Sequence, residues 1–387
     1  MFLTILAFII ILGVLVLFHE LGHFFSARIF GIKAEEFGFG LPPRLIGIYK
    51  TESGKQKIIF GKKFKSADAP HTIYSLNLIP VGGFVKIKGE NGDNKNESDS
   101  FGSKKIWQRM IVMISGVSLN AILCVLLLAL GFMFGIPSIL DESALKDAKS
   151  IQNEKIQIIS INKNSPAEKA GLIQGDEILT INELPIKSVE FLQKFTNDNN
   201  GRILDLEILR NDQTIVYKII PEILPTSAGR AVFGVGLAKT GIVSYPWHTA
   251  LWQGIKTTGY LFLAMINALI DLMKNIITKG QITAELAGPI GIAVLTGQVV
   301  NLGFSYVLQF AALLSLNLAL INILPLPALD GGRLLFLIIE KIRRKEMNQK
   351  IEALIHNLGF ALLMILIALI TYHDLARWGG RIIEKIF

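Results

Sequence analysis

Hydrophobic residues gather into four long runs along the chain, at residues 1–30, 110–136, 303–325 and 353–371. A helix needs about 20 consecutive apolar residues to span a bilayer, and each run provides about that length. The first run begins without a Lys or Arg, which argues against a cleaved signal peptide. The pattern therefore predicts a polytopic α-helical membrane protein with about four transmembrane helices.

Residues 140–240 show a different pattern, in which short β-rich pieces are separated by turn residues. A helix-start signal, Ser165-Pro166-Ala167-Glu168, follows the first of these pieces. We therefore expect one folded α+β domain between the second and third apolar runs. The expected strands cover residues 156–161, 177–181, 204–209 and 215–220.

The charge pattern gives an orientation in the membrane. The formal net charge is +8, and the basic residues concentrate in residues 31–105 and 333–350, beside apolar runs. A basic chain can bind nucleic acid, but this placement is typical of the cytoplasmic loops of membrane proteins. The expected partner is therefore the lipid bilayer and not nucleic acid. The N-terminus, the inserted domain and the C-terminus are expected on the extracytoplasmic side.

Residues 246–278 are apolar but are interrupted by Lys256, Asp271 and Lys274. They fit either an amphipathic helix lying on the membrane surface or a poor membrane span. The predicted orientation requires an even number of crossings between the second and third apolar runs. We therefore expect residues 244–280 to lie on the membrane surface.

The first apolar run contains His19-Glu20-Leu21-Gly22-His23. Histidines at positions i and i+4 lie on one face of a helix, where they can share a zinc ion, and the intervening Glu20 can act on water without being a ligand. Polar groups at this depth are costly, by about 2.5 kcal/mol or more for a charge near the centre of the helix. A bound metal would offset that cost.

Catalytic zinc sites usually take three protein ligands and leave one position open. The single cysteine, Cys124, cannot build a thiolate site alone. Asp330 is the candidate third ligand, because it follows the third apolar run after two prolines that break the helix. A plain interfacial Asp-Gly turn is the alternative. In the predicted topology His19, His23 and Asp330 all fall near the cytoplasmic leaflet.

These residues resemble the site-2 protease family of intramembrane zinc metalloproteases, and within it the bacterial regulator of sigma-E protease type. The resemblance rests mainly on residues 19–23 and on residues 322–332, and it covers nearly the whole chain. Three weaker glycine-rich stretches occur in the expected order. They are Gly38-Phe39-Gly40, Pro80-Val81-Gly82-Gly83-Phe84-Val85-Lys86 and Ala287-Gly288-Pro289-Ile290-Gly291.

The resemblance implies that His19, His23 and Asp330 bind Zn²⁺ and that Glu20 is the catalytic acid/base. It also implies that Asn322 helps to hold the substrate backbone beside the site.

The resemblance further implies that residues 36–42 and 80–88 form membrane-associated β-like elements near the substrate. Gly82, Gly83 and Phe84 are therefore candidates for substrate contact. Taken without the family, these loops fit ordinary glycine-rich turns equally well.

Residues 150–224 resemble a PDZ domain, on the strength of residues 164–172 and 175–182. Such domains accept an extended peptide or a chain end along a sheet edge, so a peptide ligand is expected here. Many relatives carry two such domains, whereas this chain has room for one. We expect the PDZ-like domain to act as a size filter or substrate sensor, and a passive spacer is the alternative.

The expected protease core has two parts, residues 1–136 and 300–387, each with two transmembrane helices. The expected function is hydrolysis of peptide bonds in transmembrane segments of membrane proteins, with anti-sigma-factor-like proteins or remnant signal peptides as substrates. The expected location is the bacterial inner membrane.

Two other functions fit parts of the pattern. A catalytically silent scaffold that binds peptide ends would not need Glu20, which is present. A zinc transporter usually shows internal repeats, which are not evident here.

Overall fold

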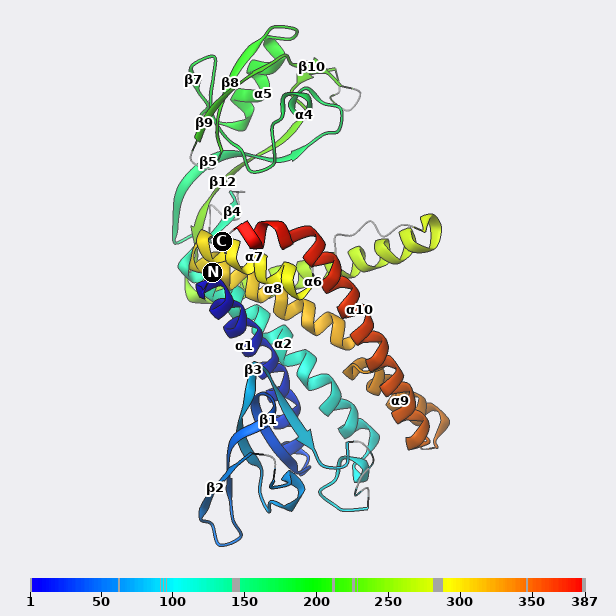
Figure 1. Ribbon diagram of the computed structural model, residues 1–387. Helices are drawn as coiled ribbons and strands as arrows, with labels where there is room; N and C mark the ends of the chain where they lie inside the picture. Colours follow the sequence, from blue (N-terminus) through cyan, green and yellow to red (C-terminus); the bar gives the residue numbers. More distant parts are fainter. Residues whose placement is uncertain are drawn as a thin grey trace. The chain divides into compact units, whose positions relative to one another are not determined.

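The computed structural model describes residues 2–384 apart from short gaps (Figure 1). The gaps are residues 62, 91, 93, 95, 141–146, 211, 212, 225, 226, 228, 281–287 and 346. Ala287, in one of the weaker family stretches, therefore lies outside the described residues. The chain divides into two compact units, one formed by Met1–Leu130 with Leu251–Phe387 and the other by Gly131–Ala250.

The first unit is built mainly of helices, and five of them among the described residues are long and apolar enough to cross a membrane. Four of the five coincide with the predicted apolar runs, which confirms these runs as helices. The fifth, Trp247–Lys279, falls on the interrupted apolar stretch of residues 246–278, where length and composition alone do not distinguish a surface helix from a span. The five are α1 (Phe2–Ile29), α2 (Ile106–Phe134), α6 (Trp247–Lys279), α8 (Phe304–Ile323) and α10 (Gln349–Glu384).

Helices α1 and α2 lie side by side because small residues line their contact (Figure 1). A Cβ added at Gly22 would lie 2.4 Å from the Ser115 carbonyl oxygen. One turn further on, the Ser26 and Ser115 hydroxyls are 2.7 Å apart. Small residues let membrane helices approach closely, and their hydroxyls add hydrogen bonds across the contact. Residues 22–26, next to and including the second histidine, are thereby held against α2.

The loop between α1 and α2 forms a sheet beside the later half of α1. Its strands are β1 (Ala34–Lys50), β2 (Gln56–Phe60) and β3 (Ile73–Ile87), in the order β2-β1-β3. The end of β3 pairs antiparallel with the start of β1, so that Phe37 faces Val85 and Phe39 faces Gly83. Of the two predicted β-like elements, residues 36–42 lie within β1 and residues 80–87 of the second lie within β3, which ends one residue before Lys88. Short 3₁₀ turns, η1 (Ser66–Asp68) and η2 (Phe101–Ser103), complete the loop.

After α8 the chain makes a tight loop before α9 (Asp330–Arg343). A Cβ added at Gly331 would lie 2.2 Å from the Leu324 carbonyl oxygen, so only glycine fits there. The Ala328 N–H donates to His356 Nδ1 of α10 at 3.0 Å. Contacts on both sides of the loop therefore hold Asp330 in place. Helix α7 (Pro289–Leu302) is shorter than the spans and lies before α8.

The second unit is an α+β fold around one sheet of long and short strands. Its strand order is β4-β12-β5-β6-β8-β9, with β7 paired to β6, and β10 and β11 form a separate pair. The predicted strands are confirmed as β5, β6, β8 and β9. The strands are β4 (Ile136–Ile139), β5 (Ser150–Ile161), β6 (Glu177–Ile181), β7 (Leu184–Pro185), β8 (Leu204–Arg210), β9 (Gln213–Ile219), β10 (Glu222–Ile223), β11 (Ala231–Val232) and β12 (Val235–Ser244).

The described residues of this unit include the helices α4 (Pro166–Ala170) and α5 (Val189–Asp198). The predicted helix start is confirmed, because the Ser165 hydroxyl caps α4 by accepting from the Glu168 N–H. The sheet extends beyond the expected 150–224 range on both sides, since β4 and β12 flank it and Phe233 lies in its core.

Candidate active site

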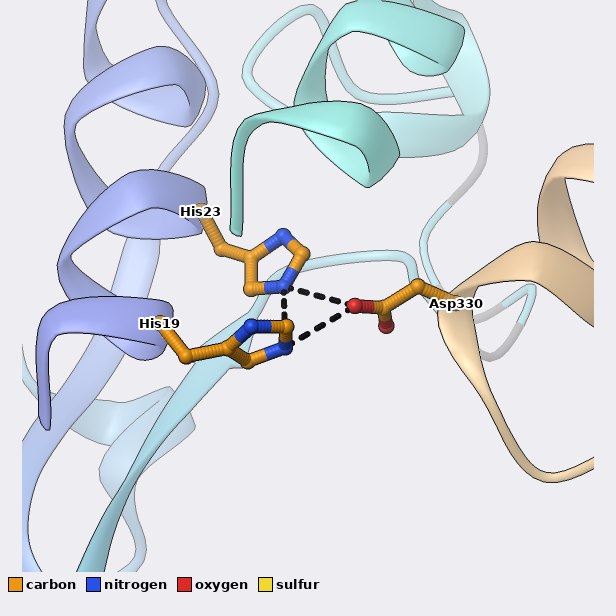
Figure 2. A group of neighbouring side chains, drawn as sticks. All are labelled: His19, His23 and Asp330. Carbon is orange, nitrogen blue, oxygen red and sulfur yellow. Dashed lines mark hydrogen bonds and ion pairs between the residues drawn. The ribbon is translucent and has the colours of Figure 1, made fainter. Parts of the chain in front are cut away.

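The three predicted metal ligands come together although Asp330 is more than 300 residues from the histidines in sequence (Figure 2). His19 Nε2 lies 2.9 Å and His23 Nε2 lies 3.1 Å from the same oxygen, Asp330 Oδ2. The two Nε2 atoms are 3.2 Å apart. Of the residues that the structure describes, these three form the one cluster of His, Cys, Asp and Glu side chains able to hold a metal ion.

The donor set and spacing fit a zinc ion. Zinc bonds of about 2.0–2.2 Å in tetrahedral geometry place neighbouring ligand atoms about 3.3–3.6 Å apart. The observed separations of 2.9–3.2 Å need only a slight spreading to reach that spacing. Two imidazole nitrogens and one carboxylate oxygen are also the ligand types that zinc takes in catalytic sites, where a fourth position stays open.

Helix α2 orients the second histidine. His23 Nδ1 donates to the Val112 carbonyl oxygen at 2.8 Å, and the residue is 5% exposed. A neutral imidazole carries its proton on one nitrogen, so this hydrogen bond leaves the Nε2 lone pair free to face Asp330. The Val112 carbonyl oxygen thus orients the His23 ring so that Nε2 can bind a metal ion.

The same helix approaches both rings at Gly116. A Cβ added there would lie 2.3 Å from His23 Nε2 and 2.9 Å from His19 Cε1. Such distances are far below van der Waals contact, so any side chain at this position would displace the imidazoles. The histidines therefore occupy space that exists only because residue 116 is glycine.

Glu20 is held by the edge of the sheet. Its Oε2 accepts a hydrogen bond from the Val85 N–H of β3 at 3.0 Å. Because this N–H points to α1, it takes no part in the ladder with β1. The carboxylate and the outer edge of β3 therefore lie next to each other, one residue along α1 from His19.

The predicted substrate-contact residues of β3 also lie against α1. A Cβ added at Gly82 would be 3.0 Å from Val16 Cγ1, and Gly82 has a φ of +79°. The Phe84 ring lies over Gly38 of the paired strand, where an added Cβ would meet it at 2.4 Å. Gly83 lies between them, opposite Phe39. The structure therefore brings Gly82, Gly83 and Phe84 close to the turn that carries Glu20.

Asn322 lies in the last turn of α8, half-buried, before the loop that leads to Asp330. Within the described part of the chain, no hydrogen bond joins it to His19, His23 or Asp330. Its predicted role beside the substrate stays a prediction.

Several groups around the site were missed by the sequence analysis. The Val85 N–H and the Val112 carbonyl are backbone groups and leave no mark in the sequence. Gly116 is one of many small residues in an apolar run. Asn120, which faces His19, did offer a signal, because an amide inside a membrane span is costly and usually has a functional partner.

Comparisons with known proteins identify the family of this chain. The family model of Peptidase family M50 matches residues 7–55 and 49–366. A putative zinc metalloprotease of Clostridium perfringens is 33% identical over 93% of this chain and 95% of its own. The regulator of sigma-W protease RasP of Bacillus subtilis is 28% identical over 97% of this chain and 98% of its own.

A solved structure matches a smaller part. The PDZ domain of an SdrC-like protein from Listeria monocytogenes is 18% identical, covering 23% of this chain and 92% of its own, with a TM-score of 0.21.

The family match extends over most of the chain and includes the helix with both histidines and the segment with Asp330. The described helices also include several that are apolar enough for a multi-pass membrane protein. The chain belongs to Peptidase family M50, the site-2 protease family of zinc metalloproteases.

Proposed function

We propose that this M50 protease hydrolyses its substrates at the cluster of His19, His23 and Asp330, with Glu20 as the acid/base. The observation that carries the proposal is the convergence of three ligand atoms within 3.2 Å of one another, beside a carboxylate fixed by β3. Zinc held there supplies a Lewis acid for the scissile carbonyl and lowers the pKa of water to about 7.

Side chains and backbone groups of the protein position the acid/base, transfer the proton and orient the ligands. The Val85 N–H holds Glu20 Oε2, which fixes the carboxylate beside the zinc ligands. Glu20 takes the proton from the attacking water and delivers it to the departing amine. His23 keeps its Nε2 lone pair toward the metal position because its Nδ1–H is bound to Val112.

The outer edge of β3 is suited to receive the substrate. A substrate helix must unwind before its carbonyls can be attacked, and each freed backbone group then needs a partner. Residues 83–87 pair with β1 on one side, while the Val85 N–H on the other side points to Glu20. An extended substrate segment added along this edge would regain hydrogen bonds and pass the catalytic carboxylate.

The directions of α1 and α8 support the proposed topology. Ile11 and Leu15 of α1 pack with Ala311 in the first half of α8, and His19 and Asp330 meet at the later ends. The two helices therefore run in the same direction through the membrane. An even number of crossings must then separate α2 from α8, which favours α6 as a surface helix and a total of four spans.

We place the site near the cytoplasmic leaflet of the bacterial inner membrane. The basic stretch that follows α1 and the basic end of α9 lie on the same side as the site, as expected for cytoplasmic loops. The second unit, inserted between α2 and α6, is then extracytoplasmic. Water for the hydrolysis would reach the site from the cytoplasm.

The second unit offers a groove for a peptide. A cavity of about 640 Å³ lies between α5 and the strands β11 and β12. Gln193 and Asn197 of α5 and Val232 and Val235 of the strands line it. A PDZ-like domain takes a peptide between such a helix and strand. The unit would then sense substrate ends or exclude bulky substrates.

The substrate class is proposed from a relative. The Bacillus subtilis relative is named as a regulator of sigma-W. An anti-sigma-factor-like membrane protein is therefore our first candidate, and remnant signal peptides are the second.

Metal removal and ligand substitution test the proposed site. Treatment with a zinc chelator should abolish cleavage of a single-span substrate by the purified protein, and added Zn²⁺ should restore it. Asp330→Ala should lower zinc affinity by a factor of about 100 or more, because a direct ligand is lost. The exposed Asp198 of α5 provides the control, since Asp198→Ala removes a carboxylate of the second unit, which contains none of the predicted ligands. Wild-type zinc affinity in Asp330→Ala would refute the ligand assignment.

A further inference from the structure

Asn120 of α2 is a buried polar residue beside His19 that the catalytic scheme does not use. It is 0% exposed, and its Nδ2 lies 3.4 Å from His19 Nδ1. Its Oδ1 is also buried, and within the described residues it has no hydrogen-bond partner. A buried amide oxygen without a partner is costly and calls for an explanation.

The hydrogen-bonding needs of a metal-binding histidine explain why this amide oxygen is buried here. His19 faces Asp330 with Nε2, so as a neutral ligand it must carry its proton on Nδ1. Nδ1–H is then a donor, and it needs an acceptor. The amide of asparagine has nearly the same shape when turned by 180°, which exchanges Oδ1 and Nδ2. With Oδ1 toward His19, both the histidine donor and the amide oxygen gain a partner.

The position of Asn120 on α2 supports this role. The Val112 carbonyl serves His23 in the same way, Gly116 makes room for both rings, and Asn120 follows at the same interval of four. Residues four apart lie on one face of a helix, so a single stripe of α2 faces both histidines. The Ser315 hydroxyl of α8 donates to the Asn120 backbone carbonyl oxygen at 2.8 Å, so this contact with α8 does not use the amide side chain.

We infer that Asn120 is a positioning residue that accepts a hydrogen bond from His19 Nδ1–H through Oδ1 and so fixes the tautomer and orientation of this zinc ligand. The inference rests on the proposed function of His19 as a ligand. The other explanation is that Asn120 only fills space between helices, and the two differ in what a substitution does to zinc binding.

The test compares substitutions at Asn120 by zinc affinity, measured on purified protein by competition with a chelator. Asn120→Leu keeps the volume and removes the acceptor, and it should lower zinc affinity by a factor of about 10–100, the usual effect of losing a partner of a ligand histidine. Asn120→Asp keeps an acceptor oxygen and should stay within about threefold of wild type. Ser315→Ala removes the hydrogen bond to the Asn120 backbone but leaves its amide, and it should also retain wild-type affinity.

The outcomes separate this inference from the ligand assignment. Wild-type affinity in Asn120→Leu, or equally weak binding in Asn120→Asp and Asn120→Leu, would overturn the role of Asn120. His19→Ala should lose zinc binding in the same assay. If His19→Ala binds zinc like the wild type, the proposed ligand set is wrong, and the inference falls with it. If Asn120→Leu does not fold, Asn120→Ala replaces it, and rescue of zinc affinity by Asn120→Asp remains the deciding comparison.

Discussion

The two histidines depend on a residue that has no side chain. Gly116 of α2 faces both rings, and a Cβ there would lie 2.3 Å from His23 Nε2. Both histidines are less than a tenth exposed, so their rings have no open space into which to retreat. Neighbouring Gly22 and Ser115 bring the helix backbones equally close. The proposed metal position therefore depends on the absence of a side chain at Gly116 of α2 as well as on the two histidines of α1.

Gly116→Ala tests this dependence. The added methyl group should push the imidazoles apart, lower zinc affinity by a factor of about 100 and abolish cleavage. Gly259→Ala is the matched control, because Gly259 is also helical but has nothing within 4 Å of the added Cβ. Zinc content and cleavage rate should be measured on both proteins. Retention of zinc by Gly116→Ala at the wild-type level would contradict the close contact between α2 and the histidines.

Much of the site could be predicted at the residue scale because its signals are local. His19, Glu20 and His23 follow a spacing set by one helical turn, and Asp330 stands out after two helix-breaking prolines. The backbone partners could not be predicted, since every residue has a carbonyl and nearly every residue an N–H, and only the fold selects Val85 and Val112.

At the scale of elements, strand β3 connects the sheet to Glu20, the proposed acid/base. Its outer edge donates the Val85 N–H to Glu20, while its inner edge pairs with β1. The glycines at 82 and 83 let the strand approach α1 at Val16 and Leu17. A change in how β3 lies against α1 would therefore move the Glu20 carboxylate, the proposed acid/base, together with the proposed substrate edge.

Val85→Pro removes this donor without placing a charge near the site. Proline has no N–H, and it is tolerated in edge strands where the N–H does not serve the ladder. We expect cleavage to fall by a factor of about 10–100 through kcat, with zinc affinity unchanged, because the metal ligands are untouched. Val85→Ala keeps the N–H and should cleave at nearly the wild-type rate. Equal rates for the proline and alanine variants would show that the hydrogen bond to Glu20 is dispensable.

The elements differ in how well the sequence predicted them. The four apolar runs are confirmed as helices because length and composition specify a span directly. The pairing of β1 with β3 could not be predicted, since it joins residues about 25–55 apart and depends on several changes of register. Composition alone could not predict how α6 lies, because its apolar residues permit a span while Lys256, Asp271 and Lys274 interrupt it.

At the scale of the whole molecule, the chain separates a membrane unit from an inserted α+β unit. The ends of the inserted unit are adjacent, since Ile136 of β4 pairs with Val243 of β12. Residues 137–242 can therefore be replaced by a short glycine linker without stretching the chain. This arrangement allows the role of the inserted unit to be tested in an otherwise complete protein.

We expect this deletion to change substrate choice and not catalysis. Cleavage of a substrate whose extracytoplasmic part has been trimmed should stay near the wild-type rate. Cleavage of the untrimmed substrate should rise about tenfold, as expected if exclusion by the unit is worth about 1.4 kcal/mol. An unchanged ratio of the two rates would identify the unit as a passive spacer.

The most direct measurement is cleavage of a single-span substrate by the wild-type protein and by Glu20→Gln, with zinc content determined on both. Glu20 is the proposed acid/base and not a ligand, so Glu20→Gln should keep its zinc and lose cleavage by a factor of about 1,000 or more. Glu52→Gln, in the exposed turn after β1, should keep both zinc and cleavage. Cleavage by Glu20→Gln at the wild-type rate, with zinc bound, would contradict the proposal that hydrolysis takes place at this cluster.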